Sequence, residues 1–258
     1  MPRLAFSDWT AEQLRCTAFT LPGAPSTAAH WWKLLADADP EQVTSNPRLG
    51  SSQAVGTFGS RPLIVSTQSD RIELFLGPLP IDAASVQGQA ATEPAPPSIG
   101  GAVEAFDVFS KLSNRWLAFE DIPGVSRLAL GGVFTHQEGD KRTSYLRLPD
   151  YLPVQIDPES SDFMFQINLP TQSRSGPKGL VINRLSKWAV TMFKLVSLNV
   201  SSGSFAHELN TTIALRTEID INTAQEFQGE LPKDRLIEIF SELIEQGRSL
   251  ITNGVLQQ

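Results

Sequence analysis

The segment from Ile213 to Asn222 alternates without a break between two sets of side chains. One set is Ile213, Leu215, Thr217, Ile219 and Ile221, and the other is Ala214, Arg216, Glu218, Asp220 and Asn222. Because successive side chains of a strand point to opposite faces of a sheet, this pattern predicts a strand with one buried and one polar face. Such strands are typical of an antiparallel sheet that is covered on one side only.

Amphipathic helices provide the cover for such a sheet. Apolar residues recur at the spacing of one helix face between about Ile99 and Phe119, and again between about Pro232 and Thr252. Pro232 suits a first helical turn, and Gly254 suits a helix stop. We therefore predict an α+β fold in which an antiparallel sheet, or two such sheets, carries helices on one face.

The predicted elements follow one order twice along the chain. The first half contains a strand at 14–20, a helix at 28–36 and strands at 53–58, 63–67 and 71–76. The second contains a strand at 125–134, a helical segment at 141–148, a strand at 163–169, one long bent strand or two strands at 180–200, and a strand at 211–222. With the two long helices, this order predicts two β-α-β-β-β-α modules whose strands join one curved sheet. The Ala-, Pro- and Ser-rich segment 79–98 is typical of a linker, so the predicted division is 1–78, 79–98 and 99–258.

Charge and cysteine content exclude several classes of protein. The net charge of -7 and the pI of about 5.0 argue against non-specific nucleic-acid binding, which requires a basic surface. The first 16 residues lack the apolar stretch of a secretory signal, and no apolar run approaches the ~20 residues that cross a bilayer. The single cysteine, Cys16, permits neither an internal disulfide nor a cysteine-built zinc site. We expect a cytoplasmic protein without a membrane partner.

No motif in the sequence predicts catalysis. The chain contains neither of the common glycine-rich phosphate loops and no G-x-S-x-G turn. His30, His136 and His207 stand apart from one another, without the spacing of a zinc site. His136 is expected in a turn and His207 in a loop before the last strand. We therefore predict no catalytic residue, no metal ligand and no cofactor.

Residues on two strands and one loop are candidates for binding. They are Arg174, Lys178, Arg184, Trp188, Arg216, Glu218 and Asp220. The loop 173–179 either binds an anion through its backbone amides or is a solvated hairpin. Arg184 and Trp188 share one side of their strand, which is either a recognition surface or, with Trp188 in the core, a covered face. Glu218 and Asp220 either hold a cation or form a wet face whose counter-charges come from Arg216 and neighbouring strands.

The stretch 28–36 places two adjacent tryptophans beside a histidine. On a helix that residue 26 or 27 caps, Trp31 lies on the apolar stripe and Trp32 lies next to it. His30 lies off that stripe and has no second ligand one turn later. The pattern predicts a helix that packs both tryptophans into a core rather than a ligand clamp.

Three segments of the second half carry a resemblance. They are VSRLALGGVF at 125–134 with Tyr145 and Leu146 after it, ALRTEIDIN at 214–222, and the closing helix that ends in RSLIT at 248–252. In these segments the chain resembles a sporadically distributed family of uncharacterised bacterial proteins of similar length, although its closing helix lacks the histidine of that family. The resemblance implies a strain-variable gene of the kind found with mobile or phage-defence modules, and it implies no known catalytic residues.

Three functions are compatible with the sequence. The first is a non-enzymatic binding or adaptor subunit of a bacterial multi-protein assembly, in phage defence or toxin neutralisation, with a protein as its partner. The second is a metal-dependent hydrolase or nuclease-like enzyme built on Glu218, Asp220 and His207. The third is a nucleic-acid sensor built on the basic residues at 174, 178 and 184. The acidic charge, the polar sheet face and the lack of a catalytic motif favour the first.

Overall fold

The structure is a computed structural model that describes residues 3–21, 27–78, 96–199 and 205–256, with only the backbone of 195–199 and 205–210. In this part of the chain eleven strands form one sheet. They are β1 (Thr10–Thr20), β2 (Gln42–Asn46), β3 (Ser51–Phe58), β4 (Arg61–Gln68), β5 (Arg71–Leu76), β6 (Gly100–Gly101), β7 (Val125–Glu138), β8 (Met164–Asn168), β9 (Thr171–Gln172), β10 (Val181–Asn199) and β11 (Phe205–Thr223). Residues 79–95 of the predicted linker lie outside the described residues.

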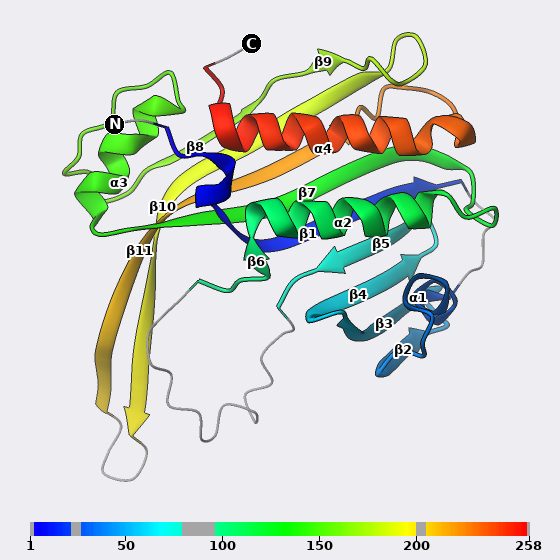
Figure 1. Ribbon diagram of the computed structural model, residues 1–258, viewed down its shortest axis with the longest axis horizontal. Coiled ribbons are helices and arrows are strands. Elements are labelled where there is room, and N and C mark those ends of the chain that lie inside the picture. The colour runs from blue at the N-terminus through cyan, green and yellow to red at the C-terminus, as the bar shows by residue number, and fades with distance from the viewer. Residues whose placement is uncertain (1–2, 22–26, 79–95, 200–204, 257–258) are drawn as a thin grey trace.

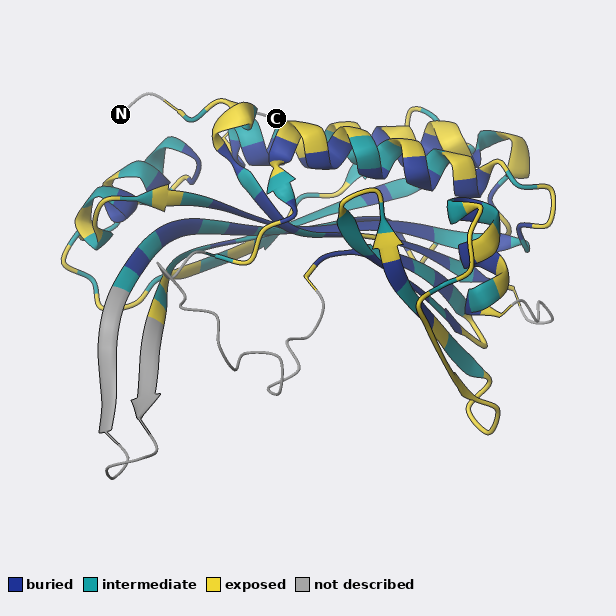
Figure 2. Cartoon of the chain, turned by 60° about the horizontal axis from the view of Figure 1, so that its bottom comes forward, coloured by how far each residue is buried: buried dark blue, intermediate teal, exposed yellow. Residues whose placement is uncertain are grey.

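Four α-helices of the described chain lie on the same face of this sheet (Figures 1 and 2). They are α1 (Ala28–Ala36), α2 (Ala102–Leu117), α3 (Lys141–Arg147) and α4 (Leu236–Asn253). The predicted α+β fold, an antiparallel sheet with helices on one face, is therefore confirmed. None of the helices that the structure describes is both long and apolar enough to span a membrane.

The two halves of the sheet have the same strand order around a central pair. The sheet runs β2-β3-β4-β5-β1-β7-β11-β10-β8, with β6 beside β1 and β9 beside β10, and every pairing is antiparallel. The first strands of the halves, β1 and β7, lie side by side, and in each half the last strand, β5 or β11, lies next to the first. Apart from the short strands β2, β6 and β9, the predicted β-α-β-β-β-α order thus occurs twice, within one continuous sheet.

The long helices bury their apolar stripes against the centre of the sheet. In α2 the side chains of Phe106, Phe109 and Trp116 are fully buried. α4 lies so close to the sheet that a Cβ on Gly247 would be 2.9 Å from Cδ1 of Ile219, so a larger residue here would force neighbouring side chains to shift. Each large apolar side chain buried in this layer contributes roughly 1.5–3 kcal/mol to stability.

α1 is the helix predicted at 28–36, and both of its tryptophans are buried. Trp31 is 0% exposed and Trp32 is 2% exposed. The Thr27 hydroxyl accepts a hydrogen bond from the His30 N–H, which caps the first turn. The His30 side chain itself is exposed, with its ring 5.3 Å from that of Trp31. The prediction of a packing helix rather than a ligand clamp is confirmed.

The structure departs from the sequence predictions at β7, β11 and β2, and in the two-residue strands β6 and β9. β7 continues to Glu138, so the prediction of a turn at His136 was wrong. β11 begins at Phe205, so the prediction of a loop through 205–208 was wrong. β2 is exposed along its whole length and has no counterpart among the predicted strands. These segments lack apolar alternation, and backbone pairing to a neighbouring strand holds them in place instead.

Candidate functional site

The side of the sheet opposite the four helices carries no described helix, and we call it the open face (Figure 2). Strand register assigns its central residues, because paired residues share a face. They are Gln13, Arg15 and Thr17 on β1; Ala129, Gly131, Val133 and Thr135 on β7; Arg216, Glu218, Asp220 and Asn222 on β11; and Asn183, Leu185, Lys187 and Ala189 on β10. The charged residues of this central set lie on β1, β10 and β11, and register adds Arg127 of β7 and Arg71 and Glu73 of β5 to the same face.

A furrow follows β7 along the middle of the open face. The β7 side chains here are small, and Gly131 has none, while longer polar side chains rise on β1 and β11. A hollow of about 300 Å³ opens between Arg15 on one wall and Glu218 and Asp220 on the other. The Arg15 side chain lies over Gly131, where a Cβ would be 3.2 Å from its Nε. The furrow therefore places a cation and two carboxylates around a floor of backbone.

An ion-pair network lies at one end of this furrow. A β-bulge between Ala11 and Gln13 leaves Glu12 as an extra residue on β1, and its side chain, only 10% exposed, meets Arg216 on the open face. The Nε of Arg216 lies 3.3 Å from Oε1 of Glu12, and its Nη1 donates to Glu218. Lys187 completes the network, with its Nζ 3.4 Å from Oε1 of Glu218.

The charges of the network hold one another in place. Burial alone would lower the pKa of the Arg216 guanidinium, but its bonds to Glu12 and Glu218 outweigh burial and raise that pKa above its usual value. Arg216 thus stays charged, and Glu218 is shared by two cations. The interpretation of Glu218 as part of a wet face with counter-charges from Arg216 and a neighbouring strand fits these contacts.

Asp220 is fixed by a second, amide-rich network. The Nδ2 of Asn222 donates to Oδ1 of Asp220 at 2.8 Å. The Oδ1 of Asn222 in turn accepts from Arg127 at 3.0 Å and from Asn183 at 3.2 Å. Asp220 is therefore oriented by its neighbours, and it still borders the furrow.

Arg184 and Trp188 lie on the other side of β10, toward the helices. Trp188 is 0% exposed, and its ring stacks on Tyr151 at 4.9 Å and meets Trp9 edge-on at 5.9 Å. Arg184 is partly buried, and burial lowers the pKa of its guanidinium. Of the two interpretations of this strand face, the structure agrees with the one that places Trp188 in the core.

The loop 173–179 connects β9 to β10 and binds an anion through its backbone amides. That anion is a side chain of the same chain, the carboxylate of Glu242 on α4. The backbone N–H of Arg174 donates to Oε1 of Glu242 at 2.9 Å, and that of Ser175 donates to Oε2 at 3.0 Å. The Ser173 hydroxyl donates to the same carboxylate at 2.8 Å. The Glu242 side chain is 2% exposed, so the loop is fastened to α4 and the amides of Arg174 and Ser175 are occupied.

We expect this carboxylate to make the stability of the protein pH-dependent. Burial raises the pKa of Glu242, but the bonds from the loop outweigh burial and lower it below its usual 4.5. A carboxylate whose folded pKa is depressed stabilises the fold above its unfolded pKa, and this stabilisation disappears as the pH falls. Glu242→Gln should cost about 1.5–3 kcal/mol at pH 7, and the difference from wild type should shrink below about pH 4.5. Denaturant unfolding across this pH range measures it.

The exposed Glu245 provides the control for that measurement. Its carboxylate contacts the same loop at Nη2 of Arg174, at 2.7 Å, but its side chain is 65% exposed. Glu245→Gln should change stability by less than about 1 kcal/mol, because solvent screens the pair. Equal losses for both variants would show that the backbone bonds to Glu242 do not stabilise the loop.

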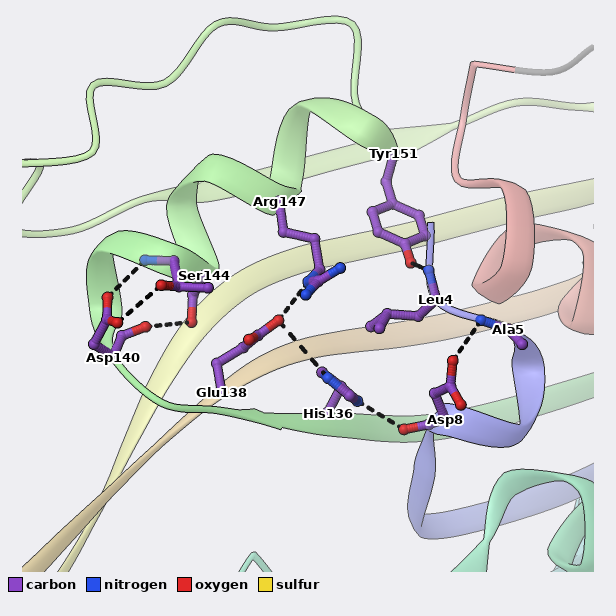
Figure 3. Close-up of polar contacts among 10 residues, drawn as sticks. Leu4, Ala5, Asp8, His136, Glu138, Asp140, Ser144, Arg147 and Tyr151 are labelled. Atoms are coloured by element: carbon purple, nitrogen blue, oxygen red, sulfur yellow. Dashed lines mark hydrogen bonds and ion pairs between the residues drawn. The ribbon is translucent and has the colours of Figure 1, made fainter. Parts of the chain in front are cut away.

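A buried polar cluster joins the N-terminal segment, the end of β7 and α3 (Figure 3). The Nε of Arg147 donates to Glu138, and their side chains are only 13% and 8% exposed. His136 lies between Oε1 of Glu138, 3.7 Å from its Nε2, and the carbonyl oxygen of Asp8, 2.7 Å from its Nδ1. These contacts join segments that are far apart in the sequence, with His136 as a bridge between the N-terminal segment and the end of β7.

Beside β8 and β10 the open face has a second, larger hollow. It measures about 610 Å³ and borders Lys187, Arg216 and Glu218 of the ion-pair network. Met164 and Met192, which are 65% and 46% exposed, also line it. Methionine and arginine are enriched at protein interfaces, and methionine adapts its shape to a partner.

The structure thus brings three of the seven candidate residues, Arg216, Glu218 and Asp220, onto one surface. Arg174 and Lys178 lie on the β9–β10 loop, and Arg184 and Trp188 lie on the helix side of β10. Within the described residues no three His, Cys, Asp or Glu side chains gather where a metal ion could bind them. The His207 side chain lies outside the described side chains.

Sequence reasoning missed four residues of this surface: Glu12, Arg15, Lys187 and Gly131. The parity of β10 could have indicated Lys187, because it alternates with buried Trp188. The Glu12 position depends on a bulge, which no sequence pattern marks.

Comparison with known proteins finds no family model that matches this chain, and no match among curated proteins or solved structures.

Proposed function

We propose that the protein is a non-enzymatic binding subunit of a bacterial multi-protein assembly and that its open face holds a protein partner. One observation carries this proposal: of the two faces of the sheet, only one is covered by described helices, and the other is lined by charged side chains fixed in networks. Side chains that are already fixed lose less conformational entropy when a partner binds. Charges held in a set pattern also select a partner of complementary pattern.

The contacts of the candidate residues favour this function over the two alternatives. An acid or base catalyst needs a free carboxylate, whereas Glu218 is shared by Arg216 and Lys187. A nucleic-acid sensor needs a basic patch, whereas Arg174 pairs with Glu242 and Glu245 on the helix side. The link to phage defence is what the family resemblance of the second half implies, and toxin neutralisation is the other assembly in which we propose such a subunit.

Site-specific photocrosslinking in the native host tests the proposal. A photoreactive residue at Gln13, on the open face, should crosslink a protein partner. The same residue at Val103, which is 40% exposed on the outer side of α2, should not. Crosslinks from Val103 alone, or from neither position, would contradict the proposal.

A further inference from the structure

The outer edge of β2 has no strand partner in the described part of the chain. β2 is the last strand on its side of the sheet, and it pairs only with β3 (Figure 1). All five of its residues are exposed. An unpaired strand edge presents backbone N–H and C=O groups to which another strand can bind. The outer edge of β2 is therefore open to pairing.

β2 lacks the features that usually keep an edge strand from pairing with another chain. Its sequence, QVTSN, contains no charged residue and no proline. Its register with β3 runs from Gln42 to Asn46 without a bulge. Charged side chains, prolines and bulges are the common means by which edge strands avoid such pairing. Neither the sequence of β2 nor its register therefore opposes a second strand.

Two aliphatic side chains at this edge are exposed to solvent. Val43, on β2, is 49% exposed, and Leu49, in the turn after β2, is 70% exposed. The value for Leu49 is the highest among the large apolar side chains that the structure describes. Covering apolar surface is favourable by roughly 25 cal/mol per Å². The edge thus combines unpaired backbone groups with apolar surface that a bound strand would cover.

The charged residues beside β2 lie at its two ends and differ in sign. Asp37, Asp39 and Glu41 precede the strand, with the Nζ of Lys33 3.3 Å from Asp39. Arg48 follows the strand, in the turn to β3, and its side chain is exposed. The start of β2 is therefore acidic, its middle uncharged and its end basic. A strand that binds here antiparallel is complementary if it has the same order of charges.

A second copy of β2 has that order. When two identical strands pair antiparallel, a two-fold axis passes between them, and the start of each lies against the end of the other. Each Glu41 then lies at the end where Arg48 of the other copy stands. The hydrogen bond that Glu41 accepts from the Thr57 N–H, at 2.9 Å, uses one of its two carboxylate oxygens. Each Val43 likewise lies toward the turn that holds Leu49 of the other copy.

We propose that β2 is a self-association site, at which two copies of this chain join edge to edge through antiparallel β2 strands. The sheet then continues from one copy into the other. Because the two-fold axis is perpendicular to the sheet, the open faces of both copies lie on the same side. This inference goes beyond the proposed function and does not rest on it: it adds that the protein presents its open face twice.

Sedimentation velocity of the full chain over a concentration series tests the proposal. Wild type should show a monomer–dimer equilibrium with a dissociation constant on the order of 10–100 μM, because a strand edge buries less surface than a standard interface. Thr44→Lys brings two like charges together near the two-fold axis and should weaken the dimer about tenfold or more. Gln166→Lys makes the same change of charge on β8, at the opposite edge of the sheet, and should leave the dimer unchanged.

A pair of charge variants tests the antiparallel arrangement itself. Arg48→Glu and Glu41→Lys each bring like charges together at both ends of the paired strands, so each variant alone should dimerise about tenfold more weakly than wild type. In a one-to-one mixture each variant meets opposite charges in the other, so dimers should form with close to wild-type affinity. Denaturant unfolding first establishes that every variant remains folded.

Four outcomes would overturn the inference. They are a wild-type chain that stays monomeric throughout the series, a dimer that Thr44→Lys leaves intact, species larger than a dimer that Gln166→Lys disperses, and a mixture of the two charge variants that dimerises no better than either alone. Crosslinking of a partner from Gln13 is a separate measurement. If the chain stays monomeric but a partner crosslinks from Gln13, the self-association site fails and the proposed function stands.

Discussion

Replacing Trp31 with alanine should lower the free energy of unfolding by about 3–5 kcal/mol. Trp31 is fully buried, its ring meets that of Trp116 edge-on at 6.2 Å, and it stacks on Phe119 at 6.4 Å. The substitution removes the contact between α1 and α2 and leaves a cavity that the helices cannot close completely. Denaturant unfolding monitored by circular dichroism measures the change.

The neighbouring residue of the same helix provides the control. His30 is exposed, so His30→Ala should change the free energy of unfolding by no more than about 0.5 kcal/mol. A Trp31→Ala protein that keeps its stability but no longer binds a partner would contradict the packing role of α1. Such a result would make α1 a candidate site for partner binding.

Replacing Arg216 with methionine should cost about 3–5 kcal/mol, because it leaves the Glu12 carboxylate buried without its counter-charge. The Glu218 carboxylate keeps one of its two counter-charges, because the Nζ of Lys187 lies 3.4 Å from its Oε1. The double variant Glu12→Gln with Arg216→Met should recover much of the loss, because no uncompensated charge remains. Unfolding of the two single variants and the double variant, as a double-mutant cycle, measures the coupling.

Lys187→Met distinguishes the buried pair from the rest of the network. Its ion pair with Glu218 is about one-third exposed on both sides, so the loss should be at most about 1 kcal/mol. One outcome of the double-mutant cycle would contradict this account. If Glu12→Gln with Arg216→Met is as unstable as Arg216→Met alone, the Glu12 carboxylate does not need Arg216 as its counter-charge, and the network does not order the open face as described.

Periodic patterns predicted the fold well and the site only in part. The alternation at 213–222 and the stripes of α2 and α4 report burial, so they correctly indicated a one-sided sheet. Parity also placed Arg216, Glu218 and Asp220 together on one face. It could not show which face of β10 the helices cover, because Trp188 suits either a core or an interface.

The features of the site that the sequence patterns did not predict depend on contacts between distant segments. Glu12 and Arg216 are 204 positions apart in the chain, and they meet because of a bulge and because β1, β7 and β11 lie side by side. The loop 173–179 has the composition of an anion-binding turn, but only the position of α4 shows that its anion is Glu242.

The central pairing of β1 with β7 also sets the order in which the protein can fold. β1 ends at Thr20 and its partner begins at Val125, so more than a hundred residues must leave the ribosome before one edge of β1 is covered. At about 5–20 residues per second, that interval lasts roughly 5–20 seconds. Throughout it, a strand that carries buried Leu14 and Cys16 has one side unpaired, and such an edge is prone to wrong pairings. We therefore expect a chaperone to shield the free edge of β1 in the nascent chain until β7 has been synthesised and pairs with it.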